Sequence, residues 1–191
     1  MWPEIALSVV WGTWVLSWIV ASAWSGQTVK RAGLGEALSY RIPTVAGAAL
    51  MVAFSASGEP GNRLYPPPPG AGSWLLVALV ALGCLFAWWA RLHLGALWSS
   101  SVTRKAEHRI VDTGPYRIVR HPIYTGLIFA LLATAAVLAT AGAFAGVALM
   151  IAGFVIKARL EERFLHEAFG PEVYEAYARR VPMLVPLWPQ G

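Results

Sequence analysis

Charged residues are scarce in this chain of 191 residues: they make up 13% of the sequence, against 57% for hydrophobic residues. A soluble domain typically has about a quarter of its residues charged. The deficit excludes an ordinary soluble domain and indicates an integral membrane protein, in which apolar stretches of about 20 residues span the hydrocarbon core. Because no polar stretch is long enough to fold separately, we expect residues 1–191 to form a single membrane domain.

Cysteine is almost absent too. Cys84 stands alone inside an apolar run, which excludes an internal disulfide and any multi-cysteine metal site. His108, His121 and His166 lack the spacing of a zinc site, and we predict no bound metal. The chain also contains no GxGxxG and no Walker motif, so the nucleotide-binding machinery of soluble enzymes is not expected.

Five apolar segments account for most of the hydrophobic content. Three cover roughly residues 5–24, 42–57 and 73–90, and two more lie within the uncharged run 123–156. As a single helix that run would be about 51 Å long, too long for one perpendicular span, so we expect a break at Thr140-Ala141-Gly142 between two helices of about 16 residues. The sequence therefore predicts an all-α integral membrane protein with about five transmembrane helices, the last two forming a helical hairpin.

Small residues recur on both arms of the predicted hairpin. Gly126, Ala130 and Thr134 are spaced by four residues, and Gly142 and Gly146 form a GxxxG pair. Such spacing lets transmembrane helices pack closely. Ala and Gly are also simply common in membrane helices, so both explanations stay open.

Basic residues orient the predicted bundle. All but one of the 15 Lys and Arg residues lie in the segments 25–41, 91–120 and 157–180, and the exception is Arg63. The positive-inside rule places these three segments in the cytoplasm. We therefore predict a multi-pass protein of the cell (inner) membrane, with its N-terminus outside and a helical C-terminal segment in the cytoplasm. Because the basic residues lie in membrane loops, we expect membrane lipids rather than nucleic acid as partners.

Tryptophan is abundant, with 10 residues in the chain. Trp11, Trp14 and Trp18 share one face of the first apolar segment. Lipid contact or helix packing is the ordinary role of such residues, and lining a groove for a lipid substrate is a second interpretation.

A polar motif precedes the fourth apolar segment and reads Gly114-Pro115-Tyr116-Arg117-Ile118-Val119-Arg120-His121-Pro122-Ile123-Tyr124. Gly-Pro is a turn signal, and Pro122 suits the first position of a helix. His121 would then lie at the helix N-terminus, where free N–H groups and the dipole favour a carboxylate or phosphate. Alternatively, His121 only caps the helix and the arginines only contact anionic lipid headgroups.

A second motif continues the fifth apolar segment and reads Lys157-Ala158-Arg159-Leu160-Glu161-Glu162-Arg163. Its charges have the spacing of surface ion pairs, which contribute little to stability. Adjacent carboxylates where a helix leaves the bilayer are more unusual, and one of them can face the bundle while the other faces water. Gly170-Pro171 should end this helix. Residues 171–180 should then form a short helix, and Val181-Pro182 should return the chain towards the membrane.

Together these features suit a zwitterionic, aromatic, hydroxylated ligand. A carboxylate can take an ammonium group or a ribose diol, and the helix N-terminus can take a carboxylate. The residues by themselves thus predict a cytoplasm-facing membrane pocket for a charged small molecule.

The two motifs, in this order, resemble the isoprenylcysteine carboxyl methyltransferase family and its bacterial and archaeal relatives, which overlap with phospholipid methyltransferases. The resemblance covers roughly residues 100–186. It rests on Gly114-Pro115-Tyr116, Arg120-His121-Pro122-Ile123-Tyr124, Glu161-Glu162, Phe169-Gly170 and Val181-Pro182. It implies that residues 100–191 form a catalytic half that binds S-adenosylmethionine (SAM) with the ends of membrane helices, while residues 1–99 supply N-terminal transmembrane helices.

The resemblance also implies roles for individual residues. The expected cofactor-binding residues are His108, Arg109, Ile110, Val111, Tyr116, His121, Pro122, Ile123, Tyr124 and Glu161. Family members use an arginine near the reacting carboxylate, four residues before the cofactor glutamate. Lys157 stands at that position here, which keeps the charge without the bidentate fork. Arg159 can take this role from a nearby face, and the expected catalytic residues are Lys157, Arg159 and Glu162.

The implied activity is SAM-dependent methyl transfer to a lipophilic small molecule, such as the carboxylate of an isoprenylcysteine. Alternatives of the same kind are phospholipid N-methylation and small-thiol S-methylation. Sterol reductases share a related helical core and use NADPH, but this chain is short for that activity. A membrane scaffold or sensor that only binds a ligand is the non-enzymatic alternative.

Overall fold

The computed structural model describes residues 2–24, 28–56, 63–66, 68–98, 103–105 and 110–187. Most of these residues are helical, which confirms the helical fold class. The α-helices in this part of the chain are α1 (Trp2–Ser22), α2 (Leu34–Ala56), α3 (Ala71–Leu94), α4 (Pro122–Leu138), α5 (Ala141–Phe169) and α6 (Pro171–Ala178). The other elements are two 3-10 turns, η2 (Gly95–Leu97) and η3 (Gly114–Arg117), and two short strands, β1 (Thr28–Arg31) and β2 (Thr103–Lys105).

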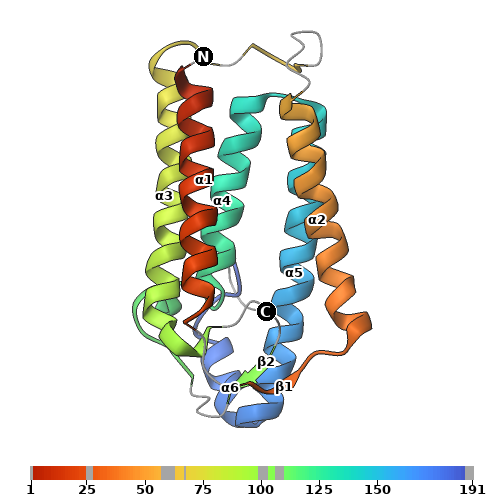
Figure 1. Cartoon of the computed structure of the whole chain (residues 1–191). Helices are drawn as coiled ribbons and strands as arrows, with labels where there is room; N and C mark the ends of the chain where they lie inside the picture. Colours follow the sequence, from red (N-terminus) through yellow and green to blue (C-terminus); the bar gives the residue numbers. More distant parts are fainter. Residues whose placement is uncertain are drawn as a thin grey trace.

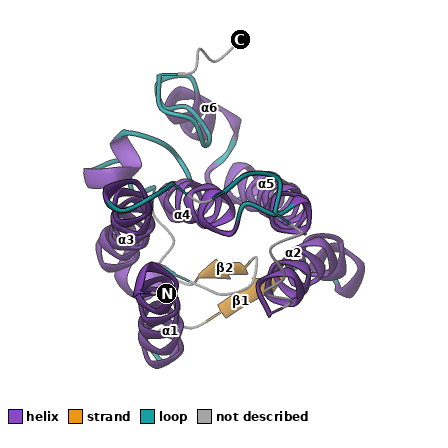
Figure 2. Ribbon diagram, turned by 90° about the horizontal axis from the view of Figure 1, so that it is seen from above, coloured by secondary structure: helices purple, strands orange, loops and turns teal. Residues whose placement is uncertain are grey.

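Helices α1 to α5 run side by side, and successive helices point in opposite directions (Figure 1). Seen along the bundle they form an arc in the order α1, α3, α4, α5, α2, and α6 lies outside the arc (Figure 2). Neighbours in this order are also the pairs that pack together. The C-terminal ends of α1, α3 and α5 therefore meet the N-terminal ends of α2 and α4 at the end of the bundle that carries α6 (Figure 1).

Among the described residues, three helices are long and apolar enough to cross a membrane: Pro3–Ser22, Ala71–Leu97 and Ala141–Phe169. α4 is apolar but shorter, so the predicted count of about five spans stays a prediction. Many large apolar side chains lie on the outside of the bundle, and Leu16 and Val20 of α1 are 66% and 77% exposed. Soluble monomers rarely expose so much apolar surface, whereas a lipid environment accommodates it.

The α6 end of the bundle also holds the two strands, which the sequence did not predict. β1 pairs with β2 in antiparallel register, with Lys30 opposite Arg104. This pairing joins the loop after α1 to the loop after α3. At the opposite end Arg63 lies 3.0 Å from the carboxylate of Glu4. The basic strands and Arg63 thus lie at opposite ends of the bundle, as their positions in the sequence predict. The cytoplasmic orientation of the α6 end stays a prediction.

The break between α4 and α5 lies close to its predicted place. Ala139 ends α4 with a left-handed backbone, φ 55°, and the Thr140 hydroxyl accepts a 3.1 Å hydrogen bond from the Ala143 N–H, which caps α5. The two helices are joined tightly, but α4 packs mainly on α3 and α5 mainly on α2. The predicted hairpin is therefore present as a connection and is not confirmed as a closely packed pair.

Small residues explain this choice of partners. A Cβ atom added at Gly83 of α3 would lie 2.6 Å from the Gly126 carbonyl oxygen of α4. A Cβ atom added at Gly146 of α5 would lie 2.6 Å from the Gly47 carbonyl oxygen of α2. Because these contacts involve backbone, a larger residue cannot fit without separating the helices. Gly126 and Gly146 thus promote close packing with α3 and α2, and not with each other.

The tryptophans of α1 contribute to packing. The rings of Trp14 and Trp18 stack with their centres 4.7 Å apart, and Trp18 meets Trp98 edge-on at 5.7 Å. The indole N–H of Trp11 donates a 3.0 Å hydrogen bond to the Thr134 hydroxyl of α4. The helix-packing interpretation of these residues is confirmed.

We predict that Gly83→Leu lowers the thermal stability of the detergent-solubilised protein, because the new side chain pushes α3 away from the α4 backbone. Overpacking of this kind typically costs about 1–3 kcal/mol. Gly12→Leu on α1 is the matched control, since none of the described atoms lies within 4 Å of a Cβ at Gly12. Thermal unfolding is monitored by tryptophan fluorescence. Equal unfolding midpoints for the two variants would contradict this account of the packing.

Candidate functional site

The two polar motifs meet where α4 begins and the charged part of α5 follows its apolar part. His121 directly precedes α4, but its side chain does not cap that helix. Its two ring nitrogens face both glutamates of the second motif instead. Nδ1 lies 3.4 Å from Glu161 Oε2, and Nε2 lies 3.3 Å from Glu162 Oε1. The geometry therefore favours a role at a site over simple capping.

Each glutamate has a second partner from the first motif. Glu161 accepts a 2.7 Å hydrogen bond from the Tyr124 hydroxyl, and Glu162 accepts a 2.6 Å bond from Arg120 Nε. The two glutamate side chains are only 24% and 20% exposed. We expected one carboxylate to face water, but both face the first motif. The reason is that His121 and its neighbours present hydrogen-bond donors to two adjacent positions of α5.

The carboxylates determine the charge of His121. Burial by itself lowers the pKa of an imidazole. Hydrogen bonds to Glu161 and Glu162, together with their negative charges, outweigh burial, so the pKa of His121 is raised above its ordinary value. A protonated imidazole donates from both ring nitrogens, which matches a carboxylate on each side. The cluster therefore places an imidazole whose protonation is favoured between two carboxylates.

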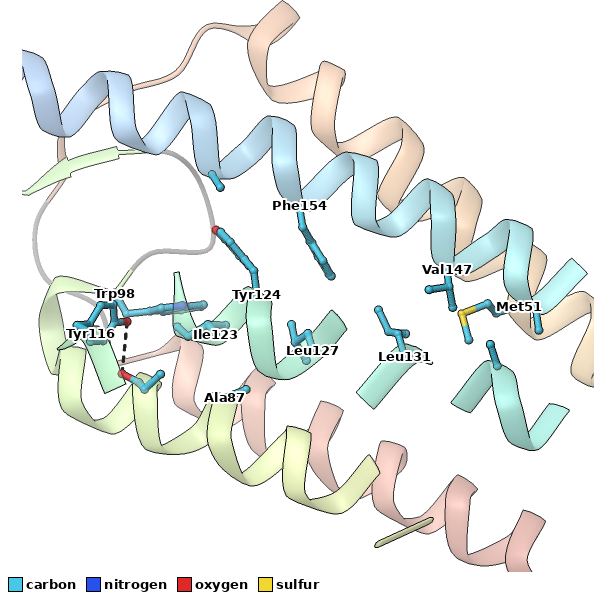
Figure 3. Close-up of a cluster of buried hydrophobic side chains, with 14 residues drawn as sticks. Met51, Ala87, Trp98, Tyr116, Ile123, Tyr124, Leu127, Leu131, Val147 and Phe154 are labelled. Carbon is cyan, nitrogen blue, oxygen red and sulfur yellow. Dashed lines mark hydrogen bonds between the residues drawn. The ribbon is translucent and has the colours of Figure 1, made fainter. Parts of the chain in front are cut away.

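Aromatic rings support this cluster from the core. The His121 ring stacks on Tyr124 with the centres 5.6 Å apart, and Tyr124 stacks on Phe154 at 5.5 Å. Tyr124 extends from α4 towards α5, with Phe154 beside it (Figure 3). The hydroxyl that binds Glu161 is thereby held in a fixed direction.

The C-terminal tail closes over the first motif. The guanidinium of Arg120 donates to the carbonyl oxygens of Ala178 at 2.8 Å and Val181 at 2.6 Å. The backbone N–H of Arg120 donates to the Pro182 carbonyl at 2.8 Å. Gly170, with φ 79°, separates α5 from α6. The predicted short helix and the return of the chain are therefore present, and one arginine side chain joins both to the glutamate pair.

Three further predicted cofactor residues lie beside the cluster. Pro122 and Ile123 are buried in the first turn of α4. The hydroxyl of Tyr116 donates to the Ala90 carbonyl oxygen of α3 at 3.5 Å (Figure 3). Tyr116 thus faces α3, and the structure does not bring its hydroxyl to the glutamates.

The segment before η3 is only partly described. Ile110 packs against the buried face of α6, and Val111 packs against the central apolar core. His108 and Arg109, which the resemblance assigns to the cofactor, lie outside the described residues.

The structure separates the two basic residues predicted near the substrate. Lys157 is largely buried, and its Nζ lies 3.9 Å from Glu161 Oε1. The same ammonium lies 5.5 Å from the ring centres of both Tyr40 and Tyr124. Arg159 is exposed, because two residues further along a helix the side chain points about 200° away. Lys157 belongs to the cluster and Arg159 does not.

Two residues of the first half of the chain, Tyr40 and Arg91, have buried positions that neither motif indicates. Tyr40 comes from α2 and meets Lys157. Arg91 is fully buried near the end of α3, where it donates to the backbone carbonyl oxygens of Ala21, Trp24 and Gly95 and lies 4.4 Å from the Trp98 ring centre. In the sequence Arg91 is visible only as the charge that follows an apolar segment, and Tyr40 only as an aromatic residue in a basic loop.

Comparison with known proteins agrees with this geometry. Residues 75–167 match the isoprenylcysteine carboxyl methyltransferase (ICMT) family. The chain is 34% identical over 117 residues to the cobalt-zinc-cadmium resistance protein CzcN of Cupriavidus metallidurans, a match that covers 60% of this chain and 52% of the relative. It is 35% identical over 127 residues to methanethiol S-methyltransferase 2 of Bradyrhizobium diazoefficiens, covering 61% and 48%. It is 36% identical over 88 residues to protein-S-isoprenylcysteine O-methyltransferase B of Arabidopsis thaliana, covering 44% and 43%.

The chain spans about half the length of these curated relatives. The family match nevertheless includes the whole of α4, most of α5 and every side chain of the cluster formed by His121, Tyr124, Lys157, Glu161 and Glu162. Residues 75–167 of this chain are therefore similar to the ICMT family.

Proposed function

We propose that this chain is a SAM-dependent methyltransferase that modifies a lipophilic small molecule at the cytoplasmic face of the membrane. The observation that carries the proposal is the meeting of His121, Tyr124 and Glu161 at the junction of α4 and α5, inside the ICMT segment. Two of the three relatives described above are named methyltransferases.

The residues of the cluster fit the chemistry of SAM, which supplies an activated methyl group when it is bound. Glu161 is held by Tyr124 and His121, so its carboxylate is oriented to accept hydrogen bonds from a ribose diol or an ammonium group. The rings of Tyr124 and Phe154 offer π faces to a base or to a cation. The family resemblance assigns further cofactor contacts to residues 108–111, 116 and 122–123.

Lys157 is the residue that we assign to the methyl acceptor. Its ammonium lies one helical turn before the Glu161 carboxylate and between two tyrosine rings, where it can hold an anionic oxygen close to the cofactor. A carboxylate is already nucleophilic and needs no general base, whereas a thiol or an amine must first lose a proton. A cation at this position therefore favours a carboxylate acceptor, and the exposed Arg159 is the weaker choice for the same role.

Glu162 has a positioning role in this proposal. It binds both His121 and Arg120, and Arg120 in turn binds the tail through backbone carbonyl groups. Removing one partner of a buried ion pair leaves the other charge uncompensated. Loss of Glu162 would therefore disturb His121 and the tail together.

Small-thiol S-methylation is the second candidate. It is favoured by the Bradyrhizobium relative, which is named as a methanethiol S-methyltransferase and matches 61% of this chain. With a thiol acceptor, Lys157 would stabilise the thiolate that attacks the methyl group.

We predict that Glu161→Gln weakens SAM binding by about ten-fold or more, because a neutral amide replaces a charged hydrogen-bond acceptor. Isothermal calorimetry on detergent-purified full-length protein measures this directly. Glu172→Gln is the matched control, since Glu172 is exposed on α6 and should bind SAM like the wild type. Folded wild-type protein that binds neither SAM nor its demethylated product would refute the proposal.

We also predict that Lys157→Met raises the KM of a carboxylate acceptor by about ten-fold or more while SAM affinity changes little, because the lost charge faces the acceptor. Methyl transfer to N-acetyl-S-farnesylcysteine, to a farnesyl thiol and to phosphatidylethanolamine separates the acceptor classes. Arg159→Met is the control and should retain the wild-type KM. Transfer to the thiol alone, with no dependence on Lys157, would select the second candidate.

A further inference from the structure

Helix α2 carries a buried phenol that the proposed cofactor site does not use. Tyr40 is 5% exposed, and its hydroxyl has no hydrogen-bond partner among the described residues. Buried polar groups are nearly always hydrogen-bonded, because an unpaired one loses its interactions with water and gains nothing in return. An unpaired hydroxyl beside a functional site is therefore a candidate ligand-binding group.

The close packing of α2 on α5 places this tyrosine at the site. Gly153 of α5 is the contact point: a Cβ added there would lie 2.9 Å from the Tyr40 carbonyl oxygen and 3.2 Å from the Thr44 amide nitrogen. Lys157 follows Gly153 by one helical turn on the same face of α5. The close approach at Gly153 thus brings the Tyr40 ring to 5.5 Å from the Lys157 ammonium.

The surroundings of Tyr40 are positively charged on the α2 side. The guanidinium of Arg41 lies 6.0 Å from the Tyr40 ring centre, and its charge reaches Lys157. On the α4 side the phenols of Tyr40 and Tyr124 are close enough to interact electrostatically. Arg41, Lys157 and the Tyr40 hydroxyl thus bring two cations and a hydrogen-bond donor to one region, and such groups bind anionic oxygens.

The neighbouring surface of α2 is apolar. Leu38, Ile42 and Val45 are 43%, 61% and 66% exposed, and by helical spacing they point about 140–200° away from Tyr40, on the outer face of α2. Tyr40 therefore faces the interior of the bundle, and this apolar outer face is not part of its surroundings. The preference for a lipophilic acid over a small hydrophilic anion rests on the proposed function.

We propose that the hydroxyl of Tyr40, together with the ammonium of Lys157, binds the anionic oxygens of a lipophilic acid that accepts the methyl group. This inference rests on the proposed methyltransferase function and adds a residue of α2 to the acceptor site. One acceptor oxygen forms a bond to the methyl carbon while the methyl–sulfur bond breaks and its electron pair stays on sulfur. No proton has to move, so Tyr40 and Lys157 act by holding the carboxylate in line.

The test uses Tyr40→Phe in full-length protein, with N-acetyl-S-farnesylcysteine as the acceptor and its carboxamide as the neutral analogue. We expect the dissociation constant of the carboxylate, from calorimetry, to rise about ten-fold, because a hydrogen bond to a charged group is lost. Binding of the carboxamide and of SAM should change less than about two-fold. Tyr65→Phe, at the opposite end of the bundle, is the control and should match the wild type in all three binding measurements.

Thermal stability without ligands is the readout that separates ligand binding from a structural role. If the Tyr40 hydroxyl is unpaired in the free protein, Tyr40→Phe should leave the unfolding midpoint unchanged or raise it. A lowered midpoint together with unchanged carboxylate binding would overturn the inference. Unchanged carboxylate binding at an unchanged midpoint would overturn it as well.

The same experiment distinguishes this inference from the proposed function. Carboxylate binding that depends on Tyr40, in a protein that transfers no methyl group, would support the anion site and refute the methyltransferase proposal. Methyl transfer to the carboxylate that is insensitive to Tyr40→Phe would support the methyltransferase proposal and overturn the role of Tyr40.

Discussion

The contact between His121 and two adjacent glutamates is the interaction on which the site depends. α4 and α5 are covalent neighbours, yet each packs chiefly on a different helix, so the polar contacts between them add to a limited apolar packing that includes the Tyr124–Phe154 stack. The ring of His121 reaches Glu161 with one nitrogen and Glu162 with the other. Because these charges are mostly removed from water, each needs its partner, and the loss of one would leave the others uncompensated. The same requirement ties the tail to the site, since Arg120 joins Glu162 to the backbone after α6.

Glycine contacts decide which helices surround that cluster. Gly83 with Gly126 and Gly47 with Gly146 bring backbones together in the pairs α3–α4 and α2–α5. The arc seen in Figure 2 follows from these two close pairs, with α4 and α5 meeting at its centre. Since the site lies at that central junction, each half of the arc delivers side chains to it from one direction. The helices of the first half of the chain therefore have a part in the site, because α2 reaches Lys157 through Tyr40.

Local signals in the sequence predicted the local features well. Pro122 begins a helix, Gly170-Pro171 separates two helices, and a break follows α4 at Ala139, because each depends on the backbone preferences of one or two residues. The convergence of the motifs on His121 and Glu161 also followed from the family resemblance. What the sequence could not predict are the partners of non-local contacts. A GxxxG pair indicates close approach without naming the other helix, so Gly146 pointed to α4 when its partner is α2. The position of Tyr40 and the inward orientation of Glu162 also depend on contacts with residues distant in the sequence. The sequence did not predict them because it does not identify the partners in such contacts.

The substitution of lysine for arginine at position 157 is also easier to understand in this geometry. An arginine offers two parallel N–H donors that match the two oxygens of a carboxylate, whereas a lysine ammonium is a compact point charge. A lysine alone therefore gives a carboxylate attraction with little control of its orientation. In our proposal Tyr40 is the second donor, from a different helix that the α2–α5 contact at Gly153 holds in place. Two donors on two rigid elements define a line between the carboxylate oxygens, which is the control of orientation that an in-line displacement needs. In the acceptor site that we propose, the function of one forked side chain is divided between Lys157 and Tyr40, and the close approach of α2 and α5 at Gly153 allows the division.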